Sequence, residues 1–273
     1  MDTDRIVADL HAHTTISDGT MTADELVDVA RETGLDWVAI TDHDRVHPDV
    51  GAPVVERDGV RVVRGIELRV DAGFERLDLL GYGVEHTDAL DAEIERLQTD
   101  REQRGAAILD TVEDRLGVDL GVEPRPGLGR PHIARAIDES PAPYDYAGAF
   151  DELIGHDGPC YVARDVTGLE RGVEILRDAC AFVGLAHPFR YDDVDAALDV
   201  ARELDAVERF YPYGHAVDDA NVERVAAESD LLLTGGTDAH ERTLAEAGLT
   251  AAAFAPVRER LPDPDPDPRL DAT

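Results

Sequence analysis

Two histidines stand two residues apart in the segment Asp9-Leu10-His11-Ala12-His13, directly after the apolar run Ile6-Val7-Ala8. Residues i and i+2 of a strand point to the same face, so both imidazoles would be directed at one point at the end of a strand. Imidazole nitrogens are common ligands of zinc and other borderline divalent ions, so this spacing favours a metal site. Taken alone, the pair has an alternative interpretation as polar surface residues with capping or turn roles.

Further groups of the same residue types follow other apolar runs that we predict to be strands. They are His43 in Thr41-Asp-His-Asp44, Glu67 in Arg64-Gly-Ile-Glu67, His187 in His187-Pro188, and Asp238 with His240 in Asp238-Ala-His240; Asp18, in Ser17-Asp18-Gly19, lies a few residues beyond the first pair. Each one alone is open to interpretation as a capping Asp or a hydrogen-bonded surface His. The carboxyl ends of parallel strands meet at one end of a barrel, and charged groups gathered there are costly unless they are paired. Together the groups indicate a metal centre at the strand ends.

The elements that position these residues follow from the hydrophobic pattern. Short apolar runs alternate with amphipathic helical patterns, which predicts repeated βα units and a parallel sheet. Strands are expected at Arg5–Leu10, Asp36–Thr41, Val60–Glu67, Arg76–Tyr82, Phe182–His187, Ala206–Tyr211 and Leu231–Gly235. Helices are expected at Thr22–Thr33, Gly168–Cys180, Asp192–Glu203 and Ala216–Glu228. Thr22 and Glu25 form a capping-box pattern, and Gly34 is placed to end the first of these helices.

The alternation breaks between residues 87 and 158, where a long charged helical pattern covers Asp88–Leu116 and a stretch rich in Pro and Gly follows. We therefore expect a barrel made of residues 1–86 and 159–255, with a helical insertion at 87–158 that acts as a lid over the active-site end. The segment Pro262-Asp-Pro-Asp-Pro-Asp-Pro268 is unsuited to a regular core element, so residues 256–273 are expected to be a flexible acidic tail.

Composition limits the class of protein. The chain of 273 residues carries 60 Asp and Glu against 26 basic residues, all of them Arg, for a formal charge of −34. Such a Lys-free acidic surface is typical of enzymes adapted to high salt, and it argues against a partner of long duplex nucleic acid. The two cysteines, Cys160 and Cys180, lack C-x-x-C spacing and are expected to be free thiols. With no signal-like or membrane-spanning apolar run, a cytoplasmic location is expected.

The motifs quoted above, together with Gly65-Ile-Glu67 and Gly236-Thr-Asp-Ala-His240, occur in an order that resembles the polymerase and histidinol phosphatase (PHP) family over nearly the whole chain. The resemblance implies a distorted seven-stranded β/α barrel that holds two or three divalent ions, such as Mn²⁺, Zn²⁺ or Fe²⁺. It also implies hydrolysis of phosphoesters by a metal-activated hydroxide.

Carried over residue by residue, the resemblance assigns three groups of ligands. One ion would be held by His11, His13, Glu67 and Asp238, a second by Glu67 and His187, and a third by Asp18, His43 and His240. The family usually has His in the fourth strand, in a pattern such as His-x-Leu-Gly, where this chain has Asp78-Leu-Leu-Gly81. Asp78 either serves as a ligand in its place, or leaves that site weak or empty, or is an ordinary surface residue of a strand.

Further residues are candidates for contact with substrate. The segment Gly129-Arg130-Pro131-His132 resembles one in PHP phosphatases that act on nucleotides, which implies that Arg130 and His132 grip a phosphate; the alternative is that Pro131 simply begins a helix. Arg190 is a second candidate for phosphate contact. His43 and His240 are candidates to protonate the leaving oxygen if they are not fully committed to metal. Tyr211 and His215 are candidates to line the pocket, whereas His47, His86 and His156 are interpreted as surface residues.

The preferred function is hydrolysis of phosphomonoesters of small nucleotides, such as a 3′,5′-nucleoside bisphosphate, or of short RNA from its 5′ end. One alternative is a phosphatase for histidinol phosphate or another small phosphate ester. A second alternative is a non-catalytic PHP module that only binds metal. An amidohydrolase with a carbamylated lysine between its metals is excluded, because the chain contains no Lys.

Overall fold

The computed structural model describes residues 4–266, which form two compact units. The first unit consists of residues up to Asp91 together with residues from Thr167 onward, and the second consists of Ala92–Val166. The sequence predicts the insertion at 87–158, whereas the second unit begins and ends later in the chain, at Ala92 and Val166. Leu90 is buried while belonging to the first unit, and Cys160 is buried in the core of the second.

A mixed sheet forms the first unit, and its strands follow the order β10-β1-β2-β4-β5-β7-β8-β9. Their bounds are β1 Ile6–Asp9, β2 Trp37–Ile40, β4 Val60–Asp71, β5 Arg76–Tyr82, β7 Phe182–Leu185, β8 Ala206–Phe210, β9 Leu232–Gly235 and β10 Leu249–Thr250. The sheet curls into a barrel: the Leu10 N–H donates to the Gly235 carbonyl at 3.0 Å, and Ala12 bridges Ala239. The expected β/α barrel is confirmed with all seven of its expected strands, and β10 is an additional, eighth strand in this order.

The expectation of a wholly parallel sheet is wrong at three strands. β5 runs antiparallel to both β4 and β7, β10 runs antiparallel to β1, and an unexpected strand β3 (Val54–Arg57) runs antiparallel to β4. The physical reason at β5 is the short connection after Asp71, because a parallel neighbour needs a crossover of a dozen or more residues. As a result, β5 begins at the end of the barrel where its neighbours β4 and β7 finish.

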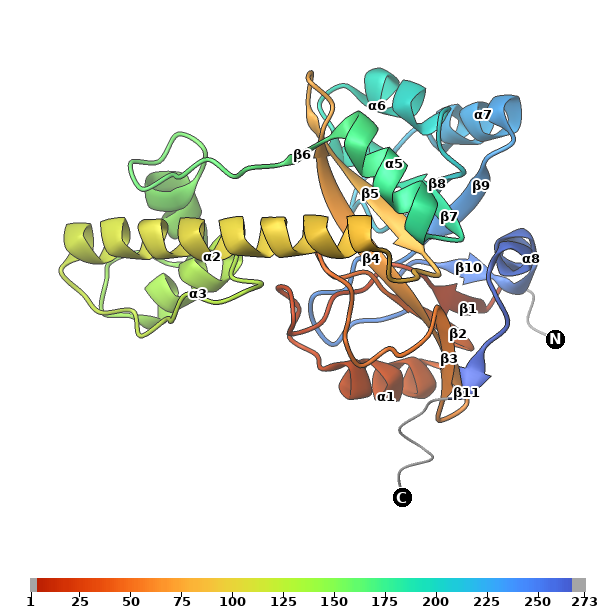
Figure 1. The fold of residues 1–273 in the computed structure, drawn as a ribbon, viewed down its shortest axis with the longest axis horizontal. Coiled ribbons are helices and arrows are strands. Elements are labelled where there is room, and N and C mark those ends of the chain that lie inside the picture. The colour runs from red at the N-terminus through yellow and green to blue at the C-terminus, as the bar shows by residue number, and fades with distance from the viewer. Residues whose placement is uncertain (1–3, 267–273) are drawn as a thin grey trace. The chain divides into compact units, whose positions relative to one another are not determined.

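Helices cover the outside of this sheet (Figure 1). Helix α1 (Ala23–Thr33) contacts β2 and β4, and it has the expected capping box of Thr22 with Glu25 and a left-handed Gly34 at its end, with φ of 80°. Helices α5 (Leu169–Ala179), α6 (Val194–Ala201) and α7 (Asp219–Ser229) contact β7, β8 and β9. The short elements η2 (Pro188–Arg190) and β6 (Thr167–Gly168) complete this flank.

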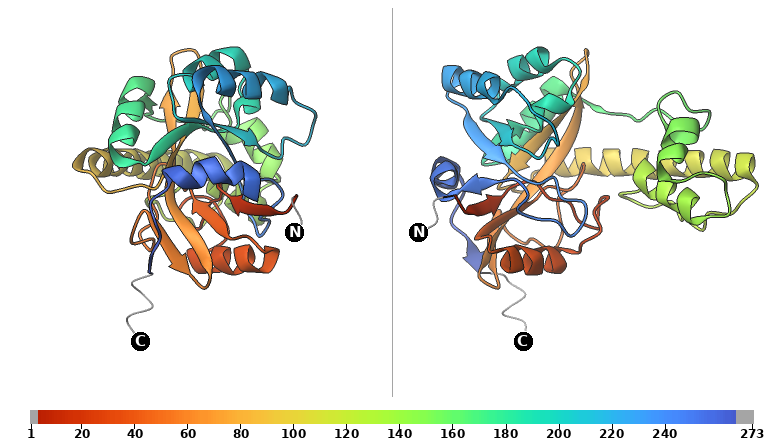
Figure 2. Two further views of the ribbon diagram at one scale, coloured as in Figure 1. Left: turned by 90° about the vertical axis from the view of Figure 1, so that its right-hand side faces the viewer. Right: turned by 180° about the vertical axis from the view of Figure 1, so that it is seen from behind.

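Helix α8 (Ala251–Arg260) lies across the barrel, as the left view of Figure 2 shows. Its residues Phe254 and Val257 join one core cluster with Trp37 and Tyr82 from the strands, and the rings of Trp37 and Phe254 are 5.2 Å apart between centroids. The expectation that residues from 256 onward form a tail is therefore wrong as far as Leu261, because apolar side chains there fill the barrel core.

The acidic Pro-rich segment is also more regular than expected. Asp265–Pro266 forms a short strand, β11, that pairs in parallel with β3. Proline is tolerated in such an edge position, where a ladder hydrogen bond is not required of its nitrogen. The part of the expected tail at residues 267–273 lies outside the described residues.

The second unit is helical and has its own core. It contains most of α2 (Asp88–Leu116), followed by α3 (Arg130–Glu139), α4 (Tyr146–Ala149) and the π-helical turn η1 (Phe150–Ile154). Ile108, Val112, Ile133 and Leu153 belong to one buried cluster there. Across residues 4–266, no helix combines the length and the apolar character that crossing a membrane requires.

Closure of the barrel predicts a sensitive glycine. A Cβ at Gly236 would overlap the His11 backbone nitrogen, whereas a Cβ at Gly168 would meet nothing within 4 Å. We expect Gly236→Ser to lower the free energy of unfolding by about 1–3 kcal/mol through overpacking. The matched variant Gly168→Ser, at the N-cap of α5, should change it by less than about 0.5 kcal/mol. Urea unfolding in molar salt measures both, and equal effects would contradict this account of closure.

Candidate metal centre

The site lies on the same strand faces that form the inner core. On β4, Val63 belongs to the core cluster, and Glu67 follows it at an even spacing on the same face. On β5, Leu80 and Tyr82 are in the core and Asp78 precedes them at the same spacing. Because β5 runs antiparallel, its first residues meet the last residues of β4. The inward-facing positions of β4 and β5 are thus apolar inside the barrel and polar at this end of it.

The structure brings all nine predicted metal ligands together. They form three groups whose donor atoms lie within 4.8 Å of one another: His11, His13, Glu67 and Asp238; His13, Asp18, His43 and His240; and Glu67, Asp78 and His187. His13 belongs to the first two groups, and Glu67 belongs to the first and third. Ions that lie close together are held by shared ligands, so this arrangement suits adjacent metal sites.

Distances within the first group fit an ion better than a hydrogen-bond network. His13 Nε2 and His11 Nε2 lie 3.0 and 3.4 Å from Asp238 Oδ1, and 3.3 and 3.5 Å from oxygens of Glu67. Ligands about 2.1 Å from a tetrahedral ion stand about 3.4 Å apart. Yet within the described residues His11 Nε2, His13 Nε2, Glu67 Oε2 and Asp238 Oδ1 are buried without a hydrogen bond of good geometry. Buried polar atoms left in this way are costly, so these donors fit a bound cation.

Electrostatics in the cluster show that protons compete with an ion. Burial lowers the pKa of His11, but the carboxylates of Glu208, Asp238 and Glu67 outweigh it and raise that pKa well above its ordinary value. Burial likewise opposes a charged His43, yet Glu67 and Asp18 raise its pKa to about 9. His13 differs, because burial and then the charges of His43 and His240 lower its pKa. Metal binding would therefore release protons from His11 and His43.

Glu208 on β8 is a buried residue that the sequence interpretation missed. Its carboxylate contacts His11 Nδ1 at 3.1 Å and accepts the His187 backbone N–H at 2.8 Å. His187 has a φ of 28° and Asp238 a φ of 55°, both in the left-handed region that is unfavourable for residues other than Gly. Glu208 therefore fixes the ring of one candidate ligand and the strained backbone of another. The available signal was an acidic residue, beside Arg209, within the otherwise apolar run Ala206-Val-Glu-Arg-Phe.

Two more buried carboxylates hold the loops that carry the ligands. Asp42 accepts hydrogen bonds from the Thr14 N–H and hydroxyl and from the Ser17 hydroxyl, which fixes the loop leading to Asp18. Asp9 accepts hydrogen bonds from the N–H and hydroxyl of Thr237, next to Asp238. The loops after β1, β2 and β9 are thereby joined to one another rather than left free.

Of the predicted phosphate contacts, Arg190 lies at the cluster. Its Nη1 donates to Tyr211 Oη at 2.9 Å and to Asp238 Oδ2 at 3.1 Å, and Tyr211 in turn donates to the same oxygen. The Arg190 side chain is 55% exposed, so its remaining donors reach solvent beside the metal centre. Tyr211, a candidate lining residue, is thus part of the site, whereas His215 contacts Tyr213 and is exposed.

Asp78 is the predicted ligand whose surroundings differ most from the others. Both of its oxygens accept hydrogen bonds from Arg69, at 2.7 Å from Nε and 2.6 Å from Nη2. Its Oδ2 lies 3.8 Å from His187 Nε2. Asp78 is buried, so it is not the surface strand residue that the sequence left as an alternative.

Arg130 and His132 lie in the second unit, at the start of α3. Pro131 occupies the first turn of this helix, and the Gly129 N–H donates to His132 Nδ1 at 3.1 Å. The helix start that the sequence suggested is present, and the phosphate role of Arg130 and His132 stays a prediction. His86 and His156 are exposed as expected, but His47 is buried, because its loop packs through Val46 and Val50.

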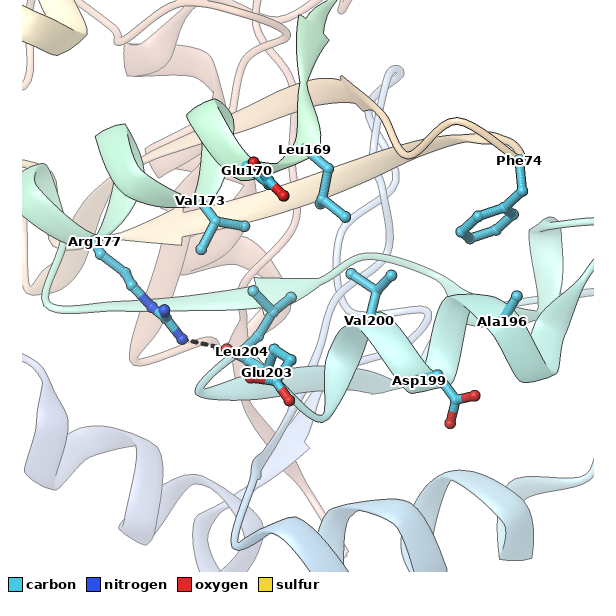
Figure 3. Close-up of a pocket in the computed structure, with 10 residues that line it drawn as sticks. All are labelled: Phe74, Leu169, Glu170, Val173, Arg177, Ala196, Asp199, Val200, Glu203 and Leu204. Atoms are coloured by element: carbon cyan, nitrogen blue, oxygen red, sulfur yellow. Dashed lines mark hydrogen bonds between the residues drawn. The ribbon is translucent and has the colours of Figure 1, made fainter.

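A groove on the flank of the first unit is separate from this centre. It has a volume of about 740 Å³ and lies between α5 and α6, beside Phe74 (Figure 3). Its lining is apolar at Leu169, Val173 and Val200, and Arg177 donates to the Glu203 carbonyl at its edge. No candidate metal ligand lines this groove. The candidate site is therefore identified by its metal-ligating side chains rather than by the volume of a cavity.

Comparison with known proteins identifies the family of this chain. The sequence pattern of the PHP domain matches residues 9–147. A phosphoribosyl 1,2-cyclic phosphate 1,2-diphosphodiesterase of Eggerthella lenta is 30% identical over 249 residues, which cover 86% of this chain and 94% of that protein. The chain belongs to the PHP family. The resemblance inferred from the sequence motifs is confirmed, and so is the expectation of a phosphoester hydrolase.

Other relatives agree with the branch expected from the sequence. A 3′,5′-nucleoside bisphosphate phosphatase of Chromobacterium violaceum is 28% identical, covering 67% of each chain. The 5′-3′ exoribonuclease Rnm of Escherichia coli is 26% identical, covering 68% of this chain and 67% of that one. Among solved structures, a metal-dependent phosphoesterase from Bifidobacterium adolescentis superposes with a TM-score of 0.78 at 23% identity, covering 94% of this PHP chain and 96% of the other, which shows the shared fold.

The support that Glu208 gives to His11 predicts a loss of metal affinity on mutation. Glu208→Gln keeps the size of the side chain, but its amide N–H group would face either His11 Nδ1 or the His187 backbone N–H, and one of these two contacts would be lost. We therefore expect the affinity for a divalent ion to fall by 10- to 100-fold, as is usual when a carboxylate that orients a metal ligand is removed. Competition against a chromophoric chelator measures the affinity. The matched variant Glu223→Gln removes a half-exposed carboxylate that pairs with Arg209 and should leave the affinity unchanged. Equal affinities in the two variants would exclude this role.

Proposed function

We propose that this PHP protein hydrolyses phosphate esters of small phosphorylated ribose compounds, with a nucleoside 3′,5′-bisphosphate as the preferred type of substrate. The observation that carries the proposal is the convergence of His11, His13, Glu67 and Asp238 into one buried group, in which each residue has a ligand atom without a hydrogen bond among the described residues. The family membership supports hydrolysis, and the donor chemistry supports dependence on a divalent metal.

In this proposal two groups of residues hold ions. His11, His13, Glu67 and Asp238 hold one, and Asp18, His43 and His240 hold another beside it. Imidazoles with carboxylates suit Mn²⁺, Zn²⁺ and Fe²⁺ alike. His43 Nε2 and His240 Nε2 face Asp18 Oδ1 at 3.7 and 3.3 Å, which favours a ligand role for both over the role of proton donor to the leaving group.

Ions bound there would lower the pKa of water to give a nucleophile at neutral pH and would neutralise charge on the phosphoryl oxygens. The chain's own contribution is orientation. Glu208 fixes His11, and Asp42 and Asp9 fix the loops that carry Asp18 and Asp238. Arg190, held by Tyr211 and Asp238, directs its exposed guanidinium edge to a phosphate oxygen, a geometry to which the planar fork is suited.

The substrate class follows from what the relatives share. Their names describe a phosphatase of nucleoside bisphosphates, an exoribonuclease and a cyclic phosphodiesterase of phosphoribose, all of which act on phosphorylated ribose. The net charge of −34 favours a small substrate over a long polymer and favours assay in molar salt, where screening lets acidic surfaces approach an anion. Arg130 and His132 remain the proposed contacts to a second phosphate.

A cyclic phosphodiester of phosphorylated ribose is a second candidate substrate. The specific observation in its favour is that the Eggerthella lenta diesterase matches 86% of this chain, whereas the bisphosphate phosphatase matches 67%. Rates on the two substrates, measured with the same preparation, separate these candidates.

We expect the Mn²⁺-loaded protein to release inorganic phosphate from a nucleoside 3′,5′-bisphosphate in molar salt, and His11→Ala to reduce release to the background of metal alone. Loss of a shared ligand removes the ion that His11 would hold. The matched variant His86→Ala removes an exposed imidazole that pairs with Asp91 and should retain full activity. Phosphate release is also measured with histidinol phosphate, and opening of the cyclic ester is measured with phosphoribosyl 1,2-cyclic phosphate, because hydrolysis of one bond of a cyclic diester leaves the phosphate attached as a monoester.

The panel also distinguishes the alternatives. Faster turnover of histidinol phosphate than of any ribose compound would replace the proposed substrate class. If no phosphoester is hydrolysed with Mn²⁺, Zn²⁺, Fe²⁺ or Mg²⁺ although the ions bind, the protein is a non-catalytic metal-binding module and the proposed function is wrong.

A further inference from the structure

Arg69 and Asp78 form a cross-strand pair at the edge of the metal centre. The antiparallel register of β4 and β5 places them directly opposite each other. The guanidinium binds the carboxylate through two parallel hydrogen bonds, with Nε to Oδ1 at 2.7 Å and Nη2 to Oδ2 at 2.6 Å. The Asp78 side chain is only 3% exposed, whereas that of Arg69 is 37% exposed. The pair therefore joins a buried carboxylate to a guanidinium that reaches the open side of the site.

This pairing changes what the third group of donors can hold. In the other two groups, oxygens of Glu67, Asp238 and Asp18 are buried without a hydrogen bond within the described residues. In the third group the facing atoms are already bonded, since both Asp78 oxygens accept from Arg69 and His187 Nε2 contacts Glu67 Oε1 at 3.2 Å. A divalent ion bound there would lie beside a fixed positive charge, which opposes its binding.

We propose that Arg69 takes the place of one ion, so that this protein binds two ions and completes the positive charge of the site with a guanidinium. The inference rests on the proposed function and defines its catalytic machinery. Nη1 of Arg69 makes no hydrogen bond within residues 4–266, although Nε and Nη2 are both engaged. Held by Asp78 and directed to the open side, Nη1 donates to a phosphoryl oxygen of the substrate.

The surroundings of the pair hold it in this arrangement. The Asp78 backbone N–H donates to Tyr191 Oη at 2.9 Å, and the Arg69 backbone N–H donates to Asp44 Oδ1 at 3.1 Å. Both backbones are therefore fixed independently of the salt bridge. Arg69 also lies two residues after Glu67 on the same strand face, so its charge is placed next to the carboxylate that the ions would share.

Metal content measured by elemental mass spectrometry tests this assignment without any assay of activity. After equilibration with Mn²⁺ and removal of free ion, the wild-type protein should retain two ions per chain. Asp78→Asn should also retain two, because Asp78 is not a ligand. Arg69→Met should retain three, because it frees Asp78 to join Glu67 and His187 as a ligand. The control Arg5→Met, which breaks the surface pair of Arg5 with Asp36, should retain two.

Steady-state kinetics provide the second readout. Loss of a charge-assisted hydrogen bond to phosphate should raise KM by at least about tenfold in Arg69→Met, and Asp78→Asn should raise KM as well because the guanidinium loses its orientation. Arg5→Met should leave KM unchanged. If Arg69→Met fails to fold, Asp78→Asn still tests the proposal through metal content and KM.

Three wild-type ions, of which Asp78→Asn removes one, would show that Asp78 is a ligand and would overturn the inference while leaving the proposed function intact. An unchanged metal content and KM in Arg69→Met would also overturn it. A wild-type protein that binds no ion and releases no phosphate would instead overturn the proposed function itself.

Discussion

Glu67 is a fully buried carboxylate that four histidines approach, and the arrangement of the barrel's polar end depends on it. His43 Nδ1 lies 2.7 Å from its Oε2, and His187, His13 and His11 lie within 3.2–3.5 Å of its two oxygens. A charge in such a place is tolerated only when cations surround it. Because the four histidines come from loops after β1, β2 and β7, satisfying this one carboxylate requires the ends of separate strands to be in register.

The sequence predicts the ligands of this centre well because the pattern that identifies each one lies within a short segment of the chain. His11 with His13 and Asp238 with His240 share a spacing that needs only a strand to bring both side chains to one face, and the strands themselves follow from apolar runs. The same reasoning places His187 just beyond β7 and Glu67 at the end of a strand, although β4 continues past Glu67 to Asp71. All nine candidate ligands are found together for this reason.

What the sequence does not predict depends on pairings between distant segments. Arg69 pairs with Asp78 only because β4 and β5 run antiparallel in a register that sets the two residues opposite each other. The expectation of a parallel sheet does not predict that register. Glu208 lies on β8, far along the chain from His11, which it contacts. Burial of His47 and the pairing of β11 with β3 likewise depend on which surfaces meet, and no periodic pattern within either segment determines that.

Pairing of β1 with β10, and its contact with the end of β9, join the first strand of the chain to some of the last. Contacts of such long sequence separation form slowly, because the loop that they close has a high entropic cost. During synthesis the N-terminal strand must therefore wait for residues near 250 to emerge before its neighbours are complete. His11 and His13 meet Asp238 only after this step, so this group of candidate ligands is complete only once β9 is in place. An ion bound there would stabilise the closed barrel by mass action, so the stability of the fold would depend on the concentration of free metal ion.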